Sequence, residues 1–286
     1  MRPPGALGAV VLALPAIAIL ATAPATGQGL NLPGATSRAP IEITADQGIE
    51  WLQKGQAYVA RGNARAKQGD VSVHADMLTA YYEGGKEGRP SRIIRIDADG
   101  KVRIVAPGET ATGDKAVYDV ERGILVLTGK PRLVTRTDRI TARDSLEYWT
   151  DRNMVVARGE AVAVRGDKRL AARVLSAHFV RDPKQGDRIV RIDAFDDVLI
   201  SSPGEIVRAA KGVYDVDSGI ATLVGSVKIS RGPNQLNGER AEVDLNTGKS
   251  RLLSGPDGPV RGIIVPGGDR RTGARAQPAP GGGERR

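Results

Sequence analysis

The sequence predicts an all-β protein built from repeated antiparallel strand pairs, and three observations support this. Segments such as residues 100–104 and 225–229 alternate polar and apolar residues, which is the period of a half-buried strand. Turns of the form Asp-x-x-x-Gly, at residues 119–123 and 215–219, separate such segments. The third observation is an internal repeat, which carries this pattern through most of the chain.

The repeat has a long period and a short one. Residues 93–98 (Ile-Ile-Arg-Ile-Asp-Ala) recur at 189–194 (Ile-Val-Arg-Ile-Asp-Ala), and Val-Tyr-Asp-Val at 117–120 recurs at 213–216 with the same offset. Within this long period lies a shorter unit of about 30 residues, which occurs about six times along the chain, as in stacked repeat architectures. The copies begin at Gly62, Gly100, Gly129, Gly159, Asp196 and Gly225.

Aligning the copies predicts which side of each strand faces inward. The residues two and four places after each opening residue are aliphatic, whereas those between them are mostly cationic, as at Arg65, Arg103 and Arg132. Successive side chains point to opposite faces of a strand, so one face is aliphatic and the other largely basic. A second aliphatic column follows later in each unit. The residues predicted to line the aliphatic surface are Val73, Val102, Ile104, Leu133, Ile140, Ala161, Ala163, Leu170, Val198, Ile200, Val207, Val227, Ile229 and Leu236.

These columns fit two interpretations, a solid core and a groove for a linear apolar ligand. Aromatic residues make up only 3% of the chain, although large rings normally fill sandwich cores efficiently. The small and β-branched composition therefore favours the groove, and the solid core stays open as the alternative.

Charge and composition limit the function classes. The net charge of +9 and the pI of about 9.9 indicate an anionic partner: nucleic acid, anionic lipid or phosphorylated glycolipid. Basic residues without interleaved aromatics argue against nucleic acid. The absence of cysteine excludes disulfides, thiolate nucleophiles and a lipoprotein anchor. No catalytic or metal-binding motif is found, and His74 and His178 are expected to be strand residues, so we expect neither enzyme activity nor a cofactor or metal.

The two ends differ from the repeats. Residues 1–25 read as a signal peptide, with cleavage after Ala25 giving a mature chain that starts near Thr26. The alternative is an uncleaved anchor, since residues 6–25 are long enough to span a bilayer. We expect a linker at 26–40, the β-domain at 41–265 and a disordered basic tail at 266–286.

The motif of the repeat resembles that of the OstA-like family of lipopolysaccharide transport proteins, to which LptA belongs. The pattern is Gly-x-apolar-x-apolar, then Gly-Asp, then apolar-x-Ala-Asp, and it occurs at residues 62–76, with a variant at 236–252. The resemblance covers roughly residues 40–254. It implies a twisted β-jellyroll of antiparallel strand pairs with an open V-shaped apolar groove. Members carry the acyl chains of lipopolysaccharide (lipid A) across the periplasm between the inner and outer membranes.

The resemblance also implies partners. Members stack head to tail through open sheet edges; an LptC-like inner-membrane protein meets the N-terminal edge, and an LptD-like outer-membrane translocon meets the C-terminal edge. The candidate edge residues here are Ile41, Ile43, Val243, Leu245 and Leu252. Alanines at positions 64, 66, 161 and 163, where larger aliphatic residues are common, predict a wider groove there.

Two further interpretations stay open. One is a membrane-anchored LptC-like relative that keeps residues 6–25 as its anchor. The other is a parallel β-helix of structural or polysaccharide-binding type, because a period near 30 residues also suits the coils of such a helix.

Overall fold

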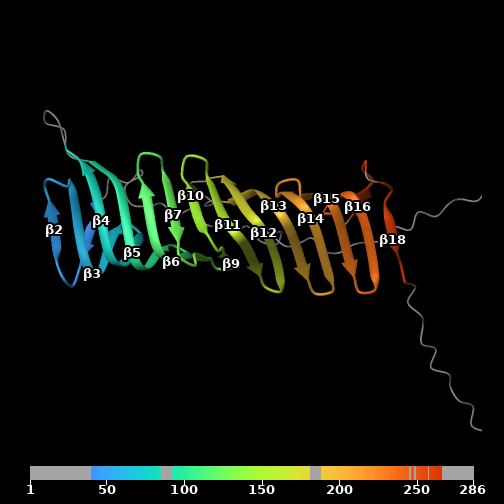
Figure 1. The fold of residues 1–286 in the computed structure, drawn as a ribbon, viewed down its shortest axis with the longest axis horizontal. Helices are drawn as coiled ribbons and strands as arrows, with labels where there is room; N and C mark the ends of the chain where they lie inside the picture. The colour runs from blue at the N-terminus through green and yellow to red at the C-terminus, as the bar shows by residue number, and fades with distance from the viewer. Residues whose placement is uncertain are drawn as a thin grey trace, which may run out of the picture.

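The chain folds into antiparallel strands that lie side by side along one long axis. The structure, a computed structural model, describes residues 40–84, 92–180, 188–244, 246–247, 249–256 and 258–265. Across these ranges there are 18 strands and no helix. Figure 1 shows them running from β2 at one end of the molecule to β18 at the other. The strands are β1 (Glu42–Thr44), β2 (Ile49–Leu52), β3 (Ala57–Gln68), β4 (Val71–Glu83), β5 (Arg92–Ala106), β6 (Glu109–Asp119), β7 (Ile124–Thr128), β8 (Arg132–Val134), β9 (Asp138–Thr141), β10 (Ser145–Trp149), β11 (Met154–Arg165), β12 (Lys168–Val180), β13 (Arg188–Ser202), β14 (Glu205–Asp215), β15 (Ile220–Arg231), β16 (Asn234–Asp244), β17 (Lys249–Leu253) and β18 (Arg261–Ile263).

Every strand pairing in the described ranges is antiparallel. The predicted all-β fold of repeated antiparallel strand pairs is therefore confirmed, and the β-helix interpretation is wrong because its strands would pair in parallel. The turns predicted at residues 119–123 and 215–219 separate β6 from β7 and β14 from β15.

Each long strand bends into two halves that belong to different layers. Strand β6 pairs with β7 through Lys115–Asp119 and with β8 through Thr110–Thr112, so its two ends lie in two sheets. We call layer 1 the sheet containing β2, β7, β10, β17 and the halves of the long strands that continue it. Layer 2 contains β1, β8, β9, β18 and the other halves. One hydrophobic core lies between the layers.

Most units begin in the middle of a long strand, whereas the unit at Gly129 begins between the short strands β7 and β8. Strands β5 and β13 have 15 residues each and run through the bend without a break. The opening residues of the units lie at the bend itself. Gly159 has a φ of 80° and Glu160 one of 47°, and this pair of left-handed residues turns β11 from layer 1 into layer 2. Glycine is favoured at such a position because it has no Cβ to clash.

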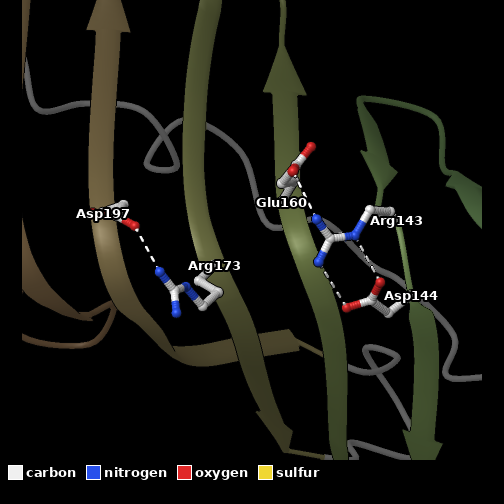
Figure 2. A network of polar contacts seen from close by, with 5 residues as sticks. All are labelled: Arg143, Asp144, Glu160, Arg173 and Asp197. Carbon is white, nitrogen blue, oxygen red and sulfur yellow. Dashed lines mark hydrogen bonds and ion pairs between the residues drawn. The ribbon is translucent and has the colours of Figure 1, made fainter.

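The bend in β13 uses aspartates where other copies use glycine. Asp196 has a φ of 61° and Asp197 one of 55°, which aspartate tolerates better than most residues. Both residues lie within β13 and form the bend of that strand. Figure 2 shows polar contacts along the bends. Arg173 of β12 contacts Asp197 of β13 at 3.2 Å, and Arg143 contacts Glu160 of β11 and its chain neighbour Asp144, both at 2.8 Å.

Small residues line the inside of the bend, where the two layers converge. Val102 pairs with Gly113 and Val227 with Gly238. A Cβ added to Gly113 would lie 2.9 Å from Leu127 Cγ, and one added to Gly238 would lie 2.8 Å from Leu252 Cγ. Both leucines belong to layer 1, so the layers leave no room for larger side chains here. This row forms the vertex of a V whose arms are the two layers.

Candidate lipid-binding groove

Most of the predicted groove residues form one continuous row across layer 2. Val73 pairs with Ile104, Ile140 with Ala163, and Ile229 with Leu236, each residue directly opposite the next. The row crosses the molecule from β1 to β16. Its members are Ile43, Ala66, Val73, Ile104, Ala111, Leu133, Ile140, Ala163, Leu170, Ile200, Val207, Ile229 and Leu236.

Four other predicted groove residues lie deeper, at the vertex. Val102, Ala161, Val198 and Val227 are each at most 2% exposed. They pack where the layers converge, so they close the bottom of the V. The predicted aliphatic residues therefore form two rows. Val102, Ala161, Val198 and Val227 form a row at the vertex, and the others belong to the row across layer 2.

Layer 1 supplies the opposite wall, which the sequence analysis did not identify. Leu78, Leu127 and Leu175 belong to a buried row that runs strand by strand across this layer. A second row contains Tyr118 and Tyr214. The repeated Val-Tyr-Asp-Val motif was the available signal, because it places these tyrosines at equivalent inward positions.

Cavities remain between the two walls. One of about 50 Å³ lies near the N-terminal end and is lined by Val73, Ile104 and Tyr118 among other residues. A cavity of about 150 Å³ lies in the middle, and one of about 40 Å³ lies towards the C-terminal end. The last two share Leu170 and Ile192 in their linings. The interior is therefore mostly packed, with apolar voids distributed along the groove.

A charged pair lies at the polar side of the central cavity. Arg165 Nε and Nη2 each donate to the Asp138 carboxylate at 2.6 Å, and the two side chains are 19% and 14% exposed. Both residues line the cavity, and both lie at the layer-2 ends of their strands, away from the vertex. They mark the open mouth of the V.

Glu205 occupies an equivalent place further along this mouth. Its side chain is buried, and the residue lies directly opposite Arg231 of β15 in the strand register. Burial raises the pKa of the Glu205 carboxyl, while the charge of Arg231 opposes that shift. The mouth of the groove therefore carries ionisable groups that are shielded from water, unlike the aliphatic row below it.

The N-terminal end of the structure presents apolar side chains on an open strand. In the described part of the chain, β2 pairs only with β3. Its residues Ile49, Trp51 and Leu52 are all exposed. The predicted edge residue Ile43 lies in β1, which among the described strands also pairs only with β3, and Ile41 directly precedes that strand. Both side chains are half-buried at the lining of the N-terminal cavity.

The C-terminal end is similarly open. Strand β18 pairs only with β16 among the described strands, and Ile263 is 61% exposed. Leu252 lies half-buried in β17. Val243 does not lie at an edge, because β15 and β17 flank it and it is 2% exposed. Leu245 falls outside the described residues.

Comparison with known proteins identifies the family. The family model described as "LptA/(LptD N-terminal domain) LPS transport protein" matches residues 42–145 and 139–249. The chain belongs to this family. Membership and the observed strands agree on the OstA-like β-jellyroll, and they assign the protein a role in lipopolysaccharide transport.

Two individual proteins were also similar. An uncharacterised protein of Rhizobium meliloti (strain 1021) is 30% identical over 131 residues, which are 44% of this chain and 68% of that protein. The crystal structure of LptH, the LptA-homologous periplasmic component of lipopolysaccharide transport from Pseudomonas aeruginosa, is 13% identical. That match covers 80% of this chain and 96% of LptH, with a TM-score of 0.22.

Proposed function

We propose that this protein is a periplasmic carrier that holds the acyl chains of lipopolysaccharide between its two layers. The observation that carries the proposal is the unbroken aliphatic row from Ile43 to Leu236, facing a second apolar wall. Removing one methylene from water contributes ~0.8 kcal/mol, so an acyl chain of about twelve carbons contributes roughly 10 kcal/mol. Similar aliphatic surroundings at every strand let a chain move along the row without a large barrier.

Binding a whole acyl chain requires the layers to separate. The central cavity of about 150 Å³ is comparable with an engineered cavity that admits benzene. A longer chain therefore has to part the walls and join neighbouring cavities. Because the layers are joined at the vertex, opening at the mouth is the movement that keeps the strand pairing intact.

Photo-crosslinking in cells tests this function. A photoreactive residue at Ile104 or Ile229, both inward-facing, is expected to capture labelled lipopolysaccharide. Val126 and Thr222 provide matched controls, because they lie on layer-1 strands one residue away from inward-facing positions and point outward. Equal capture at all four positions, or none at Ile104 and Ile229, would contradict the proposal.

We further propose that the open ends join the protein into a bridge between the membranes. Exposed Trp51 at one end and Ile263 at the other lie on strands with a free edge, and a free edge can accept a strand from a partner. In this arrangement an LptC-like inner-membrane protein contacts the N-terminal end, an LptD-like translocon contacts the C-terminal end, and copies of the chain associate head to tail.

The periplasmic location rests on residues 1–25, which lie outside the described residues. Sequencing the N-terminus of the mature protein tests it, with a start near Thr26 expected for a released carrier. An intact N-terminus in a membrane fraction would support the anchored LptC-like alternative instead. In the described residues, no helix is long and apolar enough to cross a membrane.

A further inference from the structure

The outer face of layer 2 carries a strip of basic side chains. Two cross-strand rows cover this face, one through Arg65, Arg103 and Arg132 and the other through Lys67 and Arg139. Among the described residues of these two rows, Glu42 is the one acid. The exposed cations, which we call the basic strip, are Arg65, Lys67, Arg103, Arg132, Arg139, Arg169, Arg208, Lys228 and Arg261.

The basic strip lacks the acidic partners that other arginines have. No member forms an ion pair with a described carboxylate. On the outer face of layer 1, by contrast, Arg95 pairs with Asp97 at 2.6 Å and Arg158 with Glu147 at 2.7 Å. The excess positive charge of the described strands is therefore concentrated on one face.

A histidine within the strip reports this positive field. His74 lies between Arg65 and Arg103 in the same cross-strand row. The pKa of His74 is lowered by partial burial and by the charges of these two arginines. The arginines thus disfavour further positive charge, as a site prepared for an anion does.

The strip runs parallel to the groove, on the other side of the same strands. Arg103 precedes Ile104 and Lys228 precedes Ile229, so each outward cation adjoins an inward aliphatic residue. Arg65, Arg103 and Arg132 lie on every second strand, which corresponds to a spacing of about 10 Å. Over β3 to β8, a ligand moving along the groove would pass basic groups at regular intervals. Further along this row, Val162, Ala171 and Leu199 separate Arg132 from Arg208.

We propose that the basic strip binds the phosphates of the lipid headgroup while the acyl chains occupy the groove. This inference rests on the proposed function. A lipid with its tails in the V has its headgroup at the mouth, where layer 2 ends in short hairpin turns such as residues 107–108 and 203–204. The headgroup can fold over that edge onto the outer face, and it meets the row of Lys67, Arg139 and Arg169 first. Arginine suits this role because its guanidinium binds phosphate through two parallel hydrogen bonds.

The experiment compares two triple variants of the full chain that lose equal charge. One removes part of the strip (Arg103→Gln, Arg132→Gln and Arg139→Gln). The other removes exposed cations without a described ion pair from the outer face of layer 1 (Lys211→Gln, Arg240→Gln and Arg251→Gln). The probes are bisphosphorylated lipid A, chemically dephosphorylated lipid A, and vesicles that contain 30% anionic phospholipid.

The strip variant is expected to bind bisphosphorylated lipid A about tenfold more weakly, because each exposed charge contact contributes a factor of a few. Its affinity for dephosphorylated lipid A, and both affinities of the layer-1 variant, are expected to stay within about twofold of the original chain. A third variant with lysine at positions 103, 132 and 139 is expected to recover part of the affinity. Lysine restores the positive charge but cannot make the two parallel hydrogen bonds that arginine makes to a phosphate.

Several outcomes would overturn the inference. One is an equal loss in the two triple variants, which would indicate a general charge effect. Another is a strip variant that loses binding to anionic vesicles but not to bisphosphorylated lipid A, which would make the strip a membrane contact. If the original chain binds both forms of lipid A and the strip variant matches it, the inference fails while the carrier function stands. If the original chain binds neither form, the carrier function itself fails.

Discussion

Arg165 and Asp138 lie directly opposite each other on β11 and β9 and form two hydrogen bonds of 2.6 Å beside the central cavity of about 150 Å³. Each side chain is less than one fifth exposed. Breaking one partner of such a pair costs more than removing both, because a shielded charge is left uncompensated. The pair therefore stabilises the mouth of the groove only as long as it stays complete.

Replacing Arg165 with leucine is expected to lower the free energy of unfolding by about 3 kcal/mol, because the Asp138 carboxylate loses its cationic partner and keeps only hydroxyl donors such as Thr137. The double variant Arg165→Leu/Asp138→Leu should return to within about 1 kcal/mol of the original chain. Urea unfolding followed by circular dichroism measures both values. If the double variant is less stable than the single one, the pair contributes through something other than charge compensation.

Stability should depend on pH through Glu205. Burial raises the folded-state pKa of this carboxyl above its unfolded value, so ionisation disfavours the folded state. At a pH below the unfolded pKa of about 4.3 the carboxyl is protonated in both states, and no penalty arises. The penalty develops as the pH rises from there through the folded-state pKa.

Glu205→Gln is therefore expected to raise the melting temperature at pH 7 relative to the original chain, and to change it little at pH 4. Thermal unfolding across this pH range tests the effect. A Glu205→Gln chain that is less stable at pH 7 would mean that the attraction between Glu205 and Arg231 outweighs the cost of burial.

Filling the central cavity should block lipid binding without unfolding the protein. Ala163 lines this cavity, and Ala163→Phe places a ring in a void of about 150 Å³. We expect affinity for dephosphorylated lipid A to fall at least about tenfold, equivalent to ~1.4 kcal/mol. Val162→Phe, one residue away on the outer face, is the matched control and should bind normally. Equal binding by the two variants would place the acyl chains elsewhere.

A side chain at the bend should be costly where the neighbouring strand is close. At Gly159 an added Cβ would overlap the carboxylate of Asp144, and φ is 80°. Gly159→Ala is expected to cost about 2 kcal/mol, because Asp144 has to turn aside and gives up its contact with Arg143. Gly166→Ala, with a φ of 58° but no atom within 4 Å of the added Cβ, should cost about 1 kcal/mol. Urea unfolding of the two variants gives the comparison. Equal costs would show that the left-handed backbone, and not the contact with Asp144, limits this position.

Self-association through the C-terminal end should respond to a charge on β18. Ile263→Lys is expected to weaken head-to-tail association by about tenfold, since lysine on an edge strand opposes strand addition. Val180→Lys changes an apolar residue of β12 that is also exposed, at 47%, but away from the open ends. Sedimentation equilibrium of both variants measures the association constants. A similar loss in Val180→Lys would argue against association through the open ends.

Much of the groove could be predicted because the repeat preserves strand register. Ile104, Leu133 and Ile200 occupy the same place in their units, and a constant offset places equivalent residues in one cross-strand row. Ile104 and Leu133, for example, lie on either side of Ala111. The same argument assigned Arg103 and Arg132 to the opposite face. Val243 was assigned wrongly, because alternation cannot tell whether another strand covers a strand near the end of the repeat.

The sequence by itself determined the strand composition, the alternation of inward and outward side chains, and the repeat that aligns them into rows. Only the tertiary structure decided that the opening residue of each unit is a bend, that Leu78 and Leu175 form a facing wall, and that Arg165 meets Asp138 at the mouth. The physical reason is that a period of two residues fixes the side of a strand on which a residue lies. What that side faces depends on where the chain bends and on which strand, often far along the sequence, packs against it.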